Sequence, residues 1–136
     1  MTKSWVRGFE YAKKASLKSN SKVTSKKLGA ALMSGNKLLS VGYNIFGKSH
    51  PIYQDTDEEG NDFLRNTHAE LMCLTQRKHY EDRNLTLYVY RESDSGHYAC
   101  SRPCRICMKL LESHSIKRVR FINELGNFEE NKIGGN

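Results

Sequence analysis

Two short stretches of the chain, residues 68–70 and 103–107, must meet in space if their side chains are to act together. The first reads His-Ala-Glu and the second reads Pro-Cys-Arg-Ile-Cys. His68, Cys104 and Cys107 offer one imidazole and two thiolates, which are ligands that Zn²⁺ prefers in proteins. Three protein ligands leave the fourth tetrahedral position open, as in catalytic rather than structural zinc sites. The chain is therefore expected to fold so that two helix starts meet at a metal ion.

Glu70 follows the ligand His68 by two residues and adds a group that can carry protons. A bound zinc ion lowers the pKa of water towards about 7, so hydroxide forms at neutral pH and can attack an electron-poor ring carbon. Glu70 is placed to act as general acid and base in that reaction. An H-x-E followed by P-C-x-x-C is the signature of zinc nucleobase and nucleoside deaminases. On these residues the chain resembles the cytidine and deoxycytidylate deaminase superfamily, and the resemblance covers residues 28–122.

A structural zinc site is the alternative interpretation of the same residues. A fourth ligand from Cys73, Cys100 or another histidine would close the coordination sphere. Glu70 would then only cap the helix, in the capping box that Thr67 and Glu70 can form. This alternative explains the thiols but leaves Glu70 without a chemical role. Cys73 lies in an apolar helical pattern and is expected to be a core thiol.

The length and composition of the chain limit the class of protein. A chain of 136 residues has the size of one domain, which we expect over residues 1–136. Its apolar runs are far shorter than the roughly 20 residues of a membrane span, and no apolar leader follows Met1. We therefore expect a cytoplasmic protein without a membrane partner. In that setting the four cysteines favour metal or free thiols over disulfides.

Positive charge is concentrated in the N-terminal part of the chain. Residues 1–50 contain ten Lys and Arg against Glu10 alone, a net charge of +9, whereas residues 51–136 contain twelve against fourteen acidic residues, a net charge of −2. Lys22, Lys26 and Lys27 stand in the polar, aperiodic segment 20–27, which we predict to be a loop. This distribution favours an anionic partner near the N-terminal half.

The spacing of apolar residues predicts an alternation of helices and strands. It predicts an amphipathic helix over 4–19 and a β-hairpin over 28–43, around a Ser-Gly-Asn-Lys turn. The other predicted elements are helices over 68–77 and 103–114 and strands over 85–90, 116–122 and 128–133. Gly29 and Gly42 lie inside predicted strands and indicate close approach of other backbone or of a ligand. The resemblance implies a three-layer α/β/α cytidine-deaminase-like fold with a mixed central sheet of about five strands, which this order of elements matches.

The resemblance also implies where a substrate would bind. Asn44 is expected to hold a pyrimidine carbonyl or a sugar hydroxyl through its side-chain amide, and the backbone N–H of Ala69 is expected to hold the ring. The alternative for Asn44 is that its side chain bonds its own backbone and merely ends the strand. Residues 45–66 have no clear period and are expected to form a loop over the pocket. The segment that joins the predicted strand 85–90 to Pro103 is longer than is usual in the family, and Arg102 stands where a glutamate is common.

The activity that the resemblance implies is hydrolytic deamination. The first choice is a zinc-dependent deaminase of a cytosine nucleotide or nucleoside that converts dCMP to dUMP and ammonia. A polynucleotide deaminase acting on tRNA adenosine or single-stranded cytosine is the alternative, which the basic N-terminal half favours. A non-catalytic zinc-binding module is a further alternative, against which Glu70 argues. The expected cofactor is Zn²⁺, the expected partner is a small nucleotide or nucleoside, and the expected assembly is a homo-oligomer.

Overall fold

A computed structural model of the chain describes residues 2–46, 66–76 and 84–133, and its centre is a five-stranded sheet. The strands are β1 (Leu28–Ser34), β2 (Lys37–Tyr43), β5 (Leu85–Arg91), β6 (Arg118–Ile122) and β7 (Phe128–Lys132). Their order in the sheet is β2-β1-β5-β6-β7. The sheet is mixed, because β5 and β6 are parallel whereas the other neighbouring strands are antiparallel.

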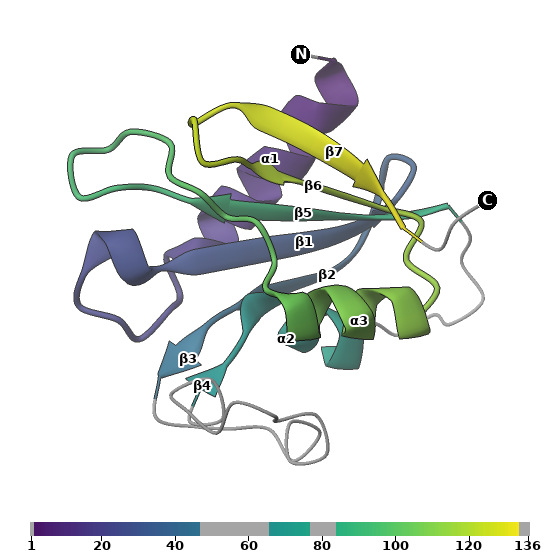
Figure 1. Ribbon diagram of the computed structural model, residues 1–136, viewed down its shortest axis with the longest axis horizontal. Helices are drawn as coiled ribbons and strands as arrows, with labels where there is room; N and C mark the ends of the chain where they lie inside the picture. The colour runs from purple at the N-terminus through teal and green to yellow at the C-terminus, as the bar shows by residue number, and fades with distance from the viewer. Residues whose placement is uncertain (1, 47–65, 77–83, 134–136) are drawn as a thin grey trace.

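Three helices cover the two faces of this sheet. They are α1 (Lys3–Ser16), α2 (Ala69–Gln76) and α3 (Arg105–Ser113). Helix α1 lies against one face, and α2 and α3 lie side by side against the other (Figure 1). The three-layer α/β/α architecture and the mixed five-stranded sheet are therefore confirmed. Within the described residues, the structure contains no helix of the length and apolar character that crossing a bilayer requires.

Helix α1 packs closely on the sheet through small and apolar side chains. Phe9, Ala12 and Ala15 are buried on its inner side. A Cβ atom at Gly29 of β1 would lie only 1.9 Å from the carbonyl oxygen of Ala12, so the glycine is what lets the helix backbone approach. The helix ends at Ser16, earlier than the predicted end at residue 19, and the Ser16 hydroxyl donates to the carbonyl of Lys13.

Helix α2 approaches the opposite face of the sheet in the same way. Its residues 69–74 are all buried. A Cβ atom at Gly42 of β2 would lie 2.2 Å from the carbonyl oxygen of Ala69, so here too the predicted close approach is one of backbone to backbone. The helix begins at Ala69, one residue later than predicted. His68 supplies the carbonyl that accepts from Met72 N (3.1 Å) and so stands at the cap position.

The parallel strands β5 and β6 separate next to the segment that leads into α3. Their pairing ends at Tyr88 and Arg120. Beyond that point the buried side chain of Ser101 lies between them: its hydroxyl donates to the carbonyl of Val89 (2.7 Å) and accepts from Ile122 N (2.9 Å). The backbone N–H of Ser101 donates to the carbonyl of Ile122 (2.8 Å). Ser101 thus replaces the missing strand-to-strand bonds and fixes where the chain leaves the sheet.

The structure contains short elements beyond those predicted. A 3₁₀ turn over Thr24–Lys26 lies inside the predicted loop 20–27. The strands β3 (Ile45–Phe46) and β4 (Asn66–Thr67) form a separate antiparallel pair at the two ends of the predicted pocket loop. The remainder of that loop prediction, 47–65, lies outside the described residues.

Candidate metal and catalytic site

Cys104 and Cys107 lie at the start of α3. Cys104 is the N-cap residue of this helix, and its Sγ accepts a hydrogen bond from Cys107 N (3.5 Å). Pro103, predicted in the first turn of the helix, instead lies just before this cap. Cys107 is buried, whereas Cys104 is exposed. Because the partial positive charge of a helix N-terminus favours a thiolate over a thiol, this position suits metal-binding cysteines.

His68 lies at the start of α2, and its ring faces both sulfur atoms. Helices α2 and α3 contact each other, which brings their first turns together. His68 Nδ1 lies 3.4 Å from Cys107 Sγ and 4.0 Å from Cys104 Sγ. All three candidate ligand atoms lie within 4.8 Å of one another. The structure therefore brings together the three residues that were predicted to hold a metal.

The spacing of these atoms fits a tetrahedral zinc ion. Bonds of about 2.3 Å from zinc to sulfur and about 2.0–2.1 Å from zinc to nitrogen place the two kinds of ligand atom about 3.6 Å apart at tetrahedral angles. The observed separations of 3.4 and 4.0 Å lie on either side of that value. One imidazole and two thiolates are also a common donor set for zinc.

The three candidate ligands interact strongly even without a metal. Hydrogen bonds from the side chain of Cys107, from His68 and from the backbone N–H of Cys107 lower the pKa of Cys104 to about 4. The same interaction with Cys104, together with burial, raises the pKa of Cys107. Burial lowers the pKa of His68, but the hydrogen bond to Cys104 and the charge of Glu70 produce a net increase. These interactions favour the thiolate form of Cys104, and metal binding must displace the protons that the other ligands hold.

Glu70 is buried in the first turn of α2, with only 5% of its surface exposed. Burial raises the pKa of its carboxyl group, although the nearby charge of His68 acts in the opposite direction. A raised pKa makes a carboxyl group hold a proton more readily, which suits a group that must carry protons during a reaction. Its charge interacts with those of His68 and Cys104, and it follows His68 by two residues in the first turn of α2. Its catalytic role stays a prediction.

Asn44 and Ala69, the predicted substrate contacts, lie at the end of β2 and the start of α2. Asn44 is buried, and its side chain joins two backbone segments: Oδ1 accepts from Leu28 N (2.9 Å) and Nδ2 donates to the carbonyl of Lys26 (2.7 Å). The alternative, in which Asn44 bonds its own local backbone, is therefore wrong, because these partners lie 16 and 18 residues away in the chain. The substrate contact of Asn44 stays a prediction. One lone pair and one N–H of this amide are still available. Ala69 begins α2, so its N–H has no partner within the helix.

The structure gives no support to a fourth protein ligand among the described residues. Cys73 is fully buried, and its Sγ lies 4.0 Å from the carbonyl of Ser40. Burial raises the pKa of this thiol, which is a property of a core cysteine rather than of a metal ligand. In the part of the chain that the structure describes, the group able to hold a metal contains neither Cys73 nor Cys100. The fourth position of the candidate site is thus free of these thiols.

Two residues that the sequence interpretation missed hold the segment before Cys104. Ser101 bridges β5 and β6. Arg102 forms two hydrogen bonds with Glu124, at 2.7 and 3.2 Å, and a longer one with Glu129 (3.4 Å). Its guanidinium also lies 4.5 Å from the centre of the Phe121 ring. A serine and an arginine before Pro-Cys carry no sequence signal for such contacts, because their partners are distant in the chain.

The basic loop 20–27 lies next to Asn44. The Asn44 amide donates to the carbonyl of Lys26. Asn20, at the start of the same loop, donates to the carbonyl of Phe46 (3.0 Å) and accepts from its N–H (2.8 Å). The structure therefore connects the segment that carries Lys22, Lys26 and Lys27 to the strand end that was predicted to contact substrate.

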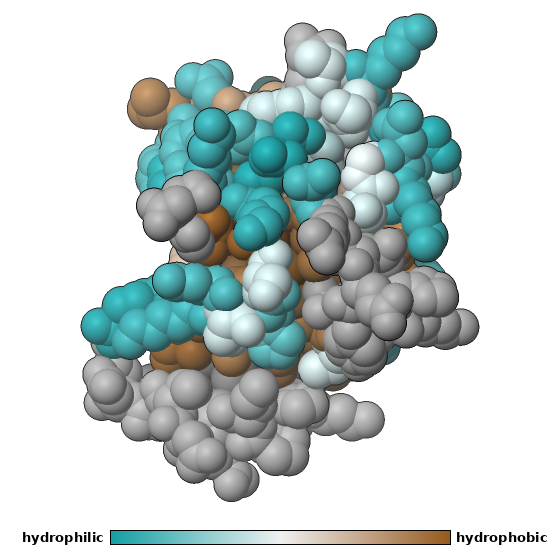
Figure 2. Space-filling model, turned by 90° about the vertical axis from the view of Figure 1, so that its right-hand side faces the viewer, coloured by the Kyte–Doolittle hydropathy of each residue, from teal (hydrophilic) through white to brown (hydrophobic). Residues whose placement is uncertain are grey.

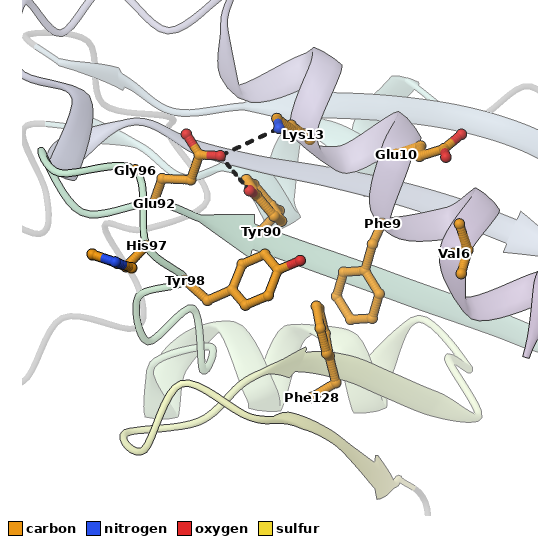
Figure 3. Close-up of a pocket in the computed structure, with 10 residues that line it drawn as sticks. All are labelled: Val6, Phe9, Glu10, Lys13, Tyr90, Glu92, Gly96, His97, Tyr98 and Phe128. Atoms are coloured by element: carbon orange, nitrogen blue, oxygen red, sulfur yellow. Dashed lines mark hydrogen bonds and ion pairs between the residues drawn. The ribbon is translucent and has the colours of Figure 1, made fainter. Parts of the chain in front are cut away.

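A cavity of about 430 Å³ lies on the α1 side of the sheet and contains none of the predicted site residues. It is bounded by α1, by the end of β5 with the loop that follows, and by β7 (Figure 3). Its walls include the rings of Phe9, Tyr90, Tyr98 and Phe128. His97 also lines it, with its Nδ1 2.9 Å from the Ser95 hydroxyl. His97 therefore borders this cavity.

Comparison with known proteins agrees with the fold and with the ligand group. The sequence matches the family of the cytidine and deoxycytidylate deaminase zinc-binding region over residues 4–123, and the chain belongs to this family. The predicted resemblance is thereby confirmed, and the protein falls among hydrolytic deaminases. No curated protein sequence gives a match.

Solved structures of the same fold include two deaminases. The cytidine deaminase from Burkholderia pseudomallei is 19% identical, with a TM-score of 0.62 over 97% of this chain and 93% of that one. The dCMP deaminase from the cyanophage S-TIM5, in its apo form, is 21% identical, with a TM-score of 0.62 over 91% of this chain and 86% of that one. At this level of identity the similarity establishes a shared fold.

Proposed function

We propose that this protein is a zinc-dependent hydrolytic deaminase of a cytosine nucleotide, with dCMP as substrate and dUMP and ammonia as products. The observation that carries the proposal is the group of His68, Cys104 and Cys107, with Glu70 buried in the first turn of the helix that follows His68. Membership of a cytidine and deoxycytidylate deaminase family supports the reaction. A cytidine deaminase and a dCMP deaminase share this fold to the same extent, so the choice of dCMP is part of the proposal and is what the experiment below tests.

The reaction exchanges the amino group on C4 of cytosine for an oxygen atom from water. Zinc, when held by His68, Cys104 and Cys107, acts as a Lewis acid that makes water a nucleophile at neutral pH. Glu70 takes one proton from the water and passes it to ring nitrogen N3, which keeps it in the product. Glu70 then transfers the second proton to the amino group, the C4–N bond breaks, and ammonia leaves as the C4 carbonyl forms.

Two groups of this chain are available to orient the ring. The N–H of Ala69 has no partner within α2 and can donate to an oxygen of the base. The amide of Asn44 has one lone pair and one N–H beyond its bonds to Leu28 and Lys26, and can hold a sugar hydroxyl or a carbonyl. Because both ends of that amide are already bonded to backbone, the side chain would meet the substrate in a fixed orientation.

The proposal is tested by incubating the purified, zinc-loaded protein with cytosine, cytidine, deoxycytidine, dCMP and dCTP. Ammonia release and the shift of the ring absorbance are followed for each. We expect dCMP to react with the highest kcat/KM, and the Glu70→Gln variant to give no comparable turnover. Reaction of a nucleoside in preference to dCMP would overturn the choice of a nucleotide. No release of ammonia from any compound would overturn the proposal for monomeric substrates as a whole.

Deamination of a polynucleotide is a second candidate, favoured by the position of the basic loop. Lys22, Lys26 and Lys27 belong to the segment that bonds the Asn44 amide, so phosphates near a bound base could meet several cations. Each phosphate neutralised on a single strand contributes a slope of about −0.7 to log K against log salt. Deamination of a cytosine oligonucleotide and of tRNA at low and high salt separates the candidates. Reaction of the polymers alone, with steep salt dependence, would favour this second function.

A further inference from the structure

A polar cavity of about 440 Å³ lies at the end of the sheet where the β1–β2 turn and the starts of β5 and β6 come together. The residues lining it are Ser4, Gly35, Asn36, Asn84, Thr86, Tyr88, Arg118 and Arg120. Figure 2 views the molecule from the side where this turn lies, and the coloured surface in the upper part of that view is mostly hydrophilic. Tyr88 packs against α1 residues, so the cavity opens on the α1 face of the sheet. The candidate metal ligands lie with α2 and α3 on the other face.

Positive charge in this cavity exceeds negative charge. Arg118 and Arg120 are two residues apart on β6 and therefore project from the same face of the sheet. Lys132 of β7 stands directly opposite Arg118. Glu130 pairs with both arginines through one oxygen, 2.9 Å from Arg120 Nε and 3.8 Å from Arg118 Nε. In the described part of the chain, Glu130 is the one acidic side chain paired with either guanidinium, so the cluster is not neutral by itself.

The guanidinium of Arg120 is held in position before any ligand arrives. Its Nη1 donates to the hydroxyl of Tyr88, and its carbon lies 4.5 Å from the centre of the Trp5 ring. Only 15% of its side chain is exposed. A guanidinium that is fixed and partly desolvated binds the paired oxygens of an anion more strongly than a mobile, hydrated one.

Thr86 adds a hydroxyl group to the wall of this cavity. Only 5% of this residue is exposed, and it lines the cavity. Its hydroxyl makes no hydrogen bond with any residue that the structure describes, and it is not fully buried, so it is open to the cavity. Its register partner on β6 is Arg118, so this hydroxyl lies beside the less constrained of the two guanidinium groups. An oxygen bound between them would satisfy both donors.

We propose that this cavity is a binding site for a phosphate group carried by a small phosphorylated molecule. Its volume lies in the range of small-ligand sites, which is about 300–1,000 Å³. Two guanidinium groups, the Thr86 hydroxyl and the amides of Asn36 and Asn84 line the cavity and are donors of the kind that bind phosphate. The site is separate from the metal centre, and the proposal does not depend on the deaminase reaction.

The test uses pyrophosphate as the probe, titrated by calorimetry into the full-length protein at low ionic strength. We expect saturable binding that Arg118→Gln weakens roughly ten- to hundredfold, because one charge-assisted interaction is lost. The matched control is Lys109→Gln, which removes an exposed cation on α3 and should leave the affinity unchanged. The absence of binding at millimolar pyrophosphate, or an equal loss in both variants, would overturn the site.

A second pair of variants separates the site from a general effect of charge or folding. Thr86→Ser keeps the hydroxyl and should retain binding, whereas Thr86→Val removes it at nearly equal volume and should weaken binding severalfold. Equal affinities for the two variants, with equal melting temperatures, would exclude Thr86 from the site.

A single-stranded oligonucleotide is titrated in parallel. If it binds in an Arg118-dependent way while pyrophosphate does not, the phosphate comes from a nucleic-acid backbone and the small-molecule source is wrong.

Discussion

Replacing Ser101 by alanine should destabilise the protein far more than a surface serine substitution would. The hydroxyl donates to the carbonyl of Val89 and accepts from Ile122 N, so its loss leaves a carbonyl and an N–H unpaired where β5 and β6 separate. Both of these residues are fully buried. An unpaired buried polar group costs about 1–3 kcal/mol, so we expect a loss of about 3 kcal/mol in the free energy of unfolding.

Urea unfolding followed by circular dichroism measures this loss. With an m-value of about 1.5–3 kcal/mol/M, the Ser101→Ala midpoint should fall by about 1–2 M. The control is Ser113→Ala, which removes an exposed hydroxyl bonded within α3 to the carbonyl of Leu110, and it should change stability by less than about 0.5 kcal/mol. A Ser101→Ala variant as stable as this control would refute the bridging role. Since Ser101 precedes Cys104, the variant should also lose zinc more readily to a chelator.

Three further predictions concern the site and its support. Cys104→Ala and Cys107→Ala should abolish tight zinc binding in metal analysis while Cys73→Ala retains it, and full zinc in the first two would disprove the ligand assignment. Glu70→Gln should keep its zinc and its fold but lose about 10²–10⁴ in kcat, because a general acid and base is removed; near-normal turnover would exclude it from the reaction. Gly42→Ala should destabilise by more than about 2 kcal/mol in urea unfolding, because its Cβ would lie 2.2 Å from a backbone oxygen of α2; an unchanged midpoint would contradict that packing.

The ligand group could be predicted from the sequence because its signals are local. Cys104 and Cys107 are one helical turn apart, and a proline before them marks a helix start, so spacing alone places both sulfurs together. His68 with Glu70 marks a second helix start. That the two starts meet was implied by the family resemblance, and the structure brings them within hydrogen-bonding distance.

The contacts that support the site could not be predicted, because they depend on pairings between distant segments. Asn44 bonds the backbone of Leu28 and Lys26 only because the loop 20–27 returns to the end of β2. In the sequence Ser101 is an ordinary loop residue. Its role follows from the separation of the parallel strands β5 and β6, whose backbones it bonds on either side. In the same way, the alternation of basic and apolar residues in β6 predicted a strand. It did not indicate that Arg118 would line a cavity rather than face open solvent.

The separation of the candidate ligands along the chain affects the stability of the folded protein. His68 is 36 residues from Cys104 and 39 from Cys107. A metal ion bound to all three would act as a cross-link, and the chain-entropy relation for a closed loop of this length gives about 4 kcal/mol of stabilisation. Domains have net stabilities of only about 5–15 kcal/mol. Zinc deprivation would therefore remove a large share of the net stability and raise the unfolded fraction that proteases degrade, so that the abundance of the protein would depend on the supply of metal.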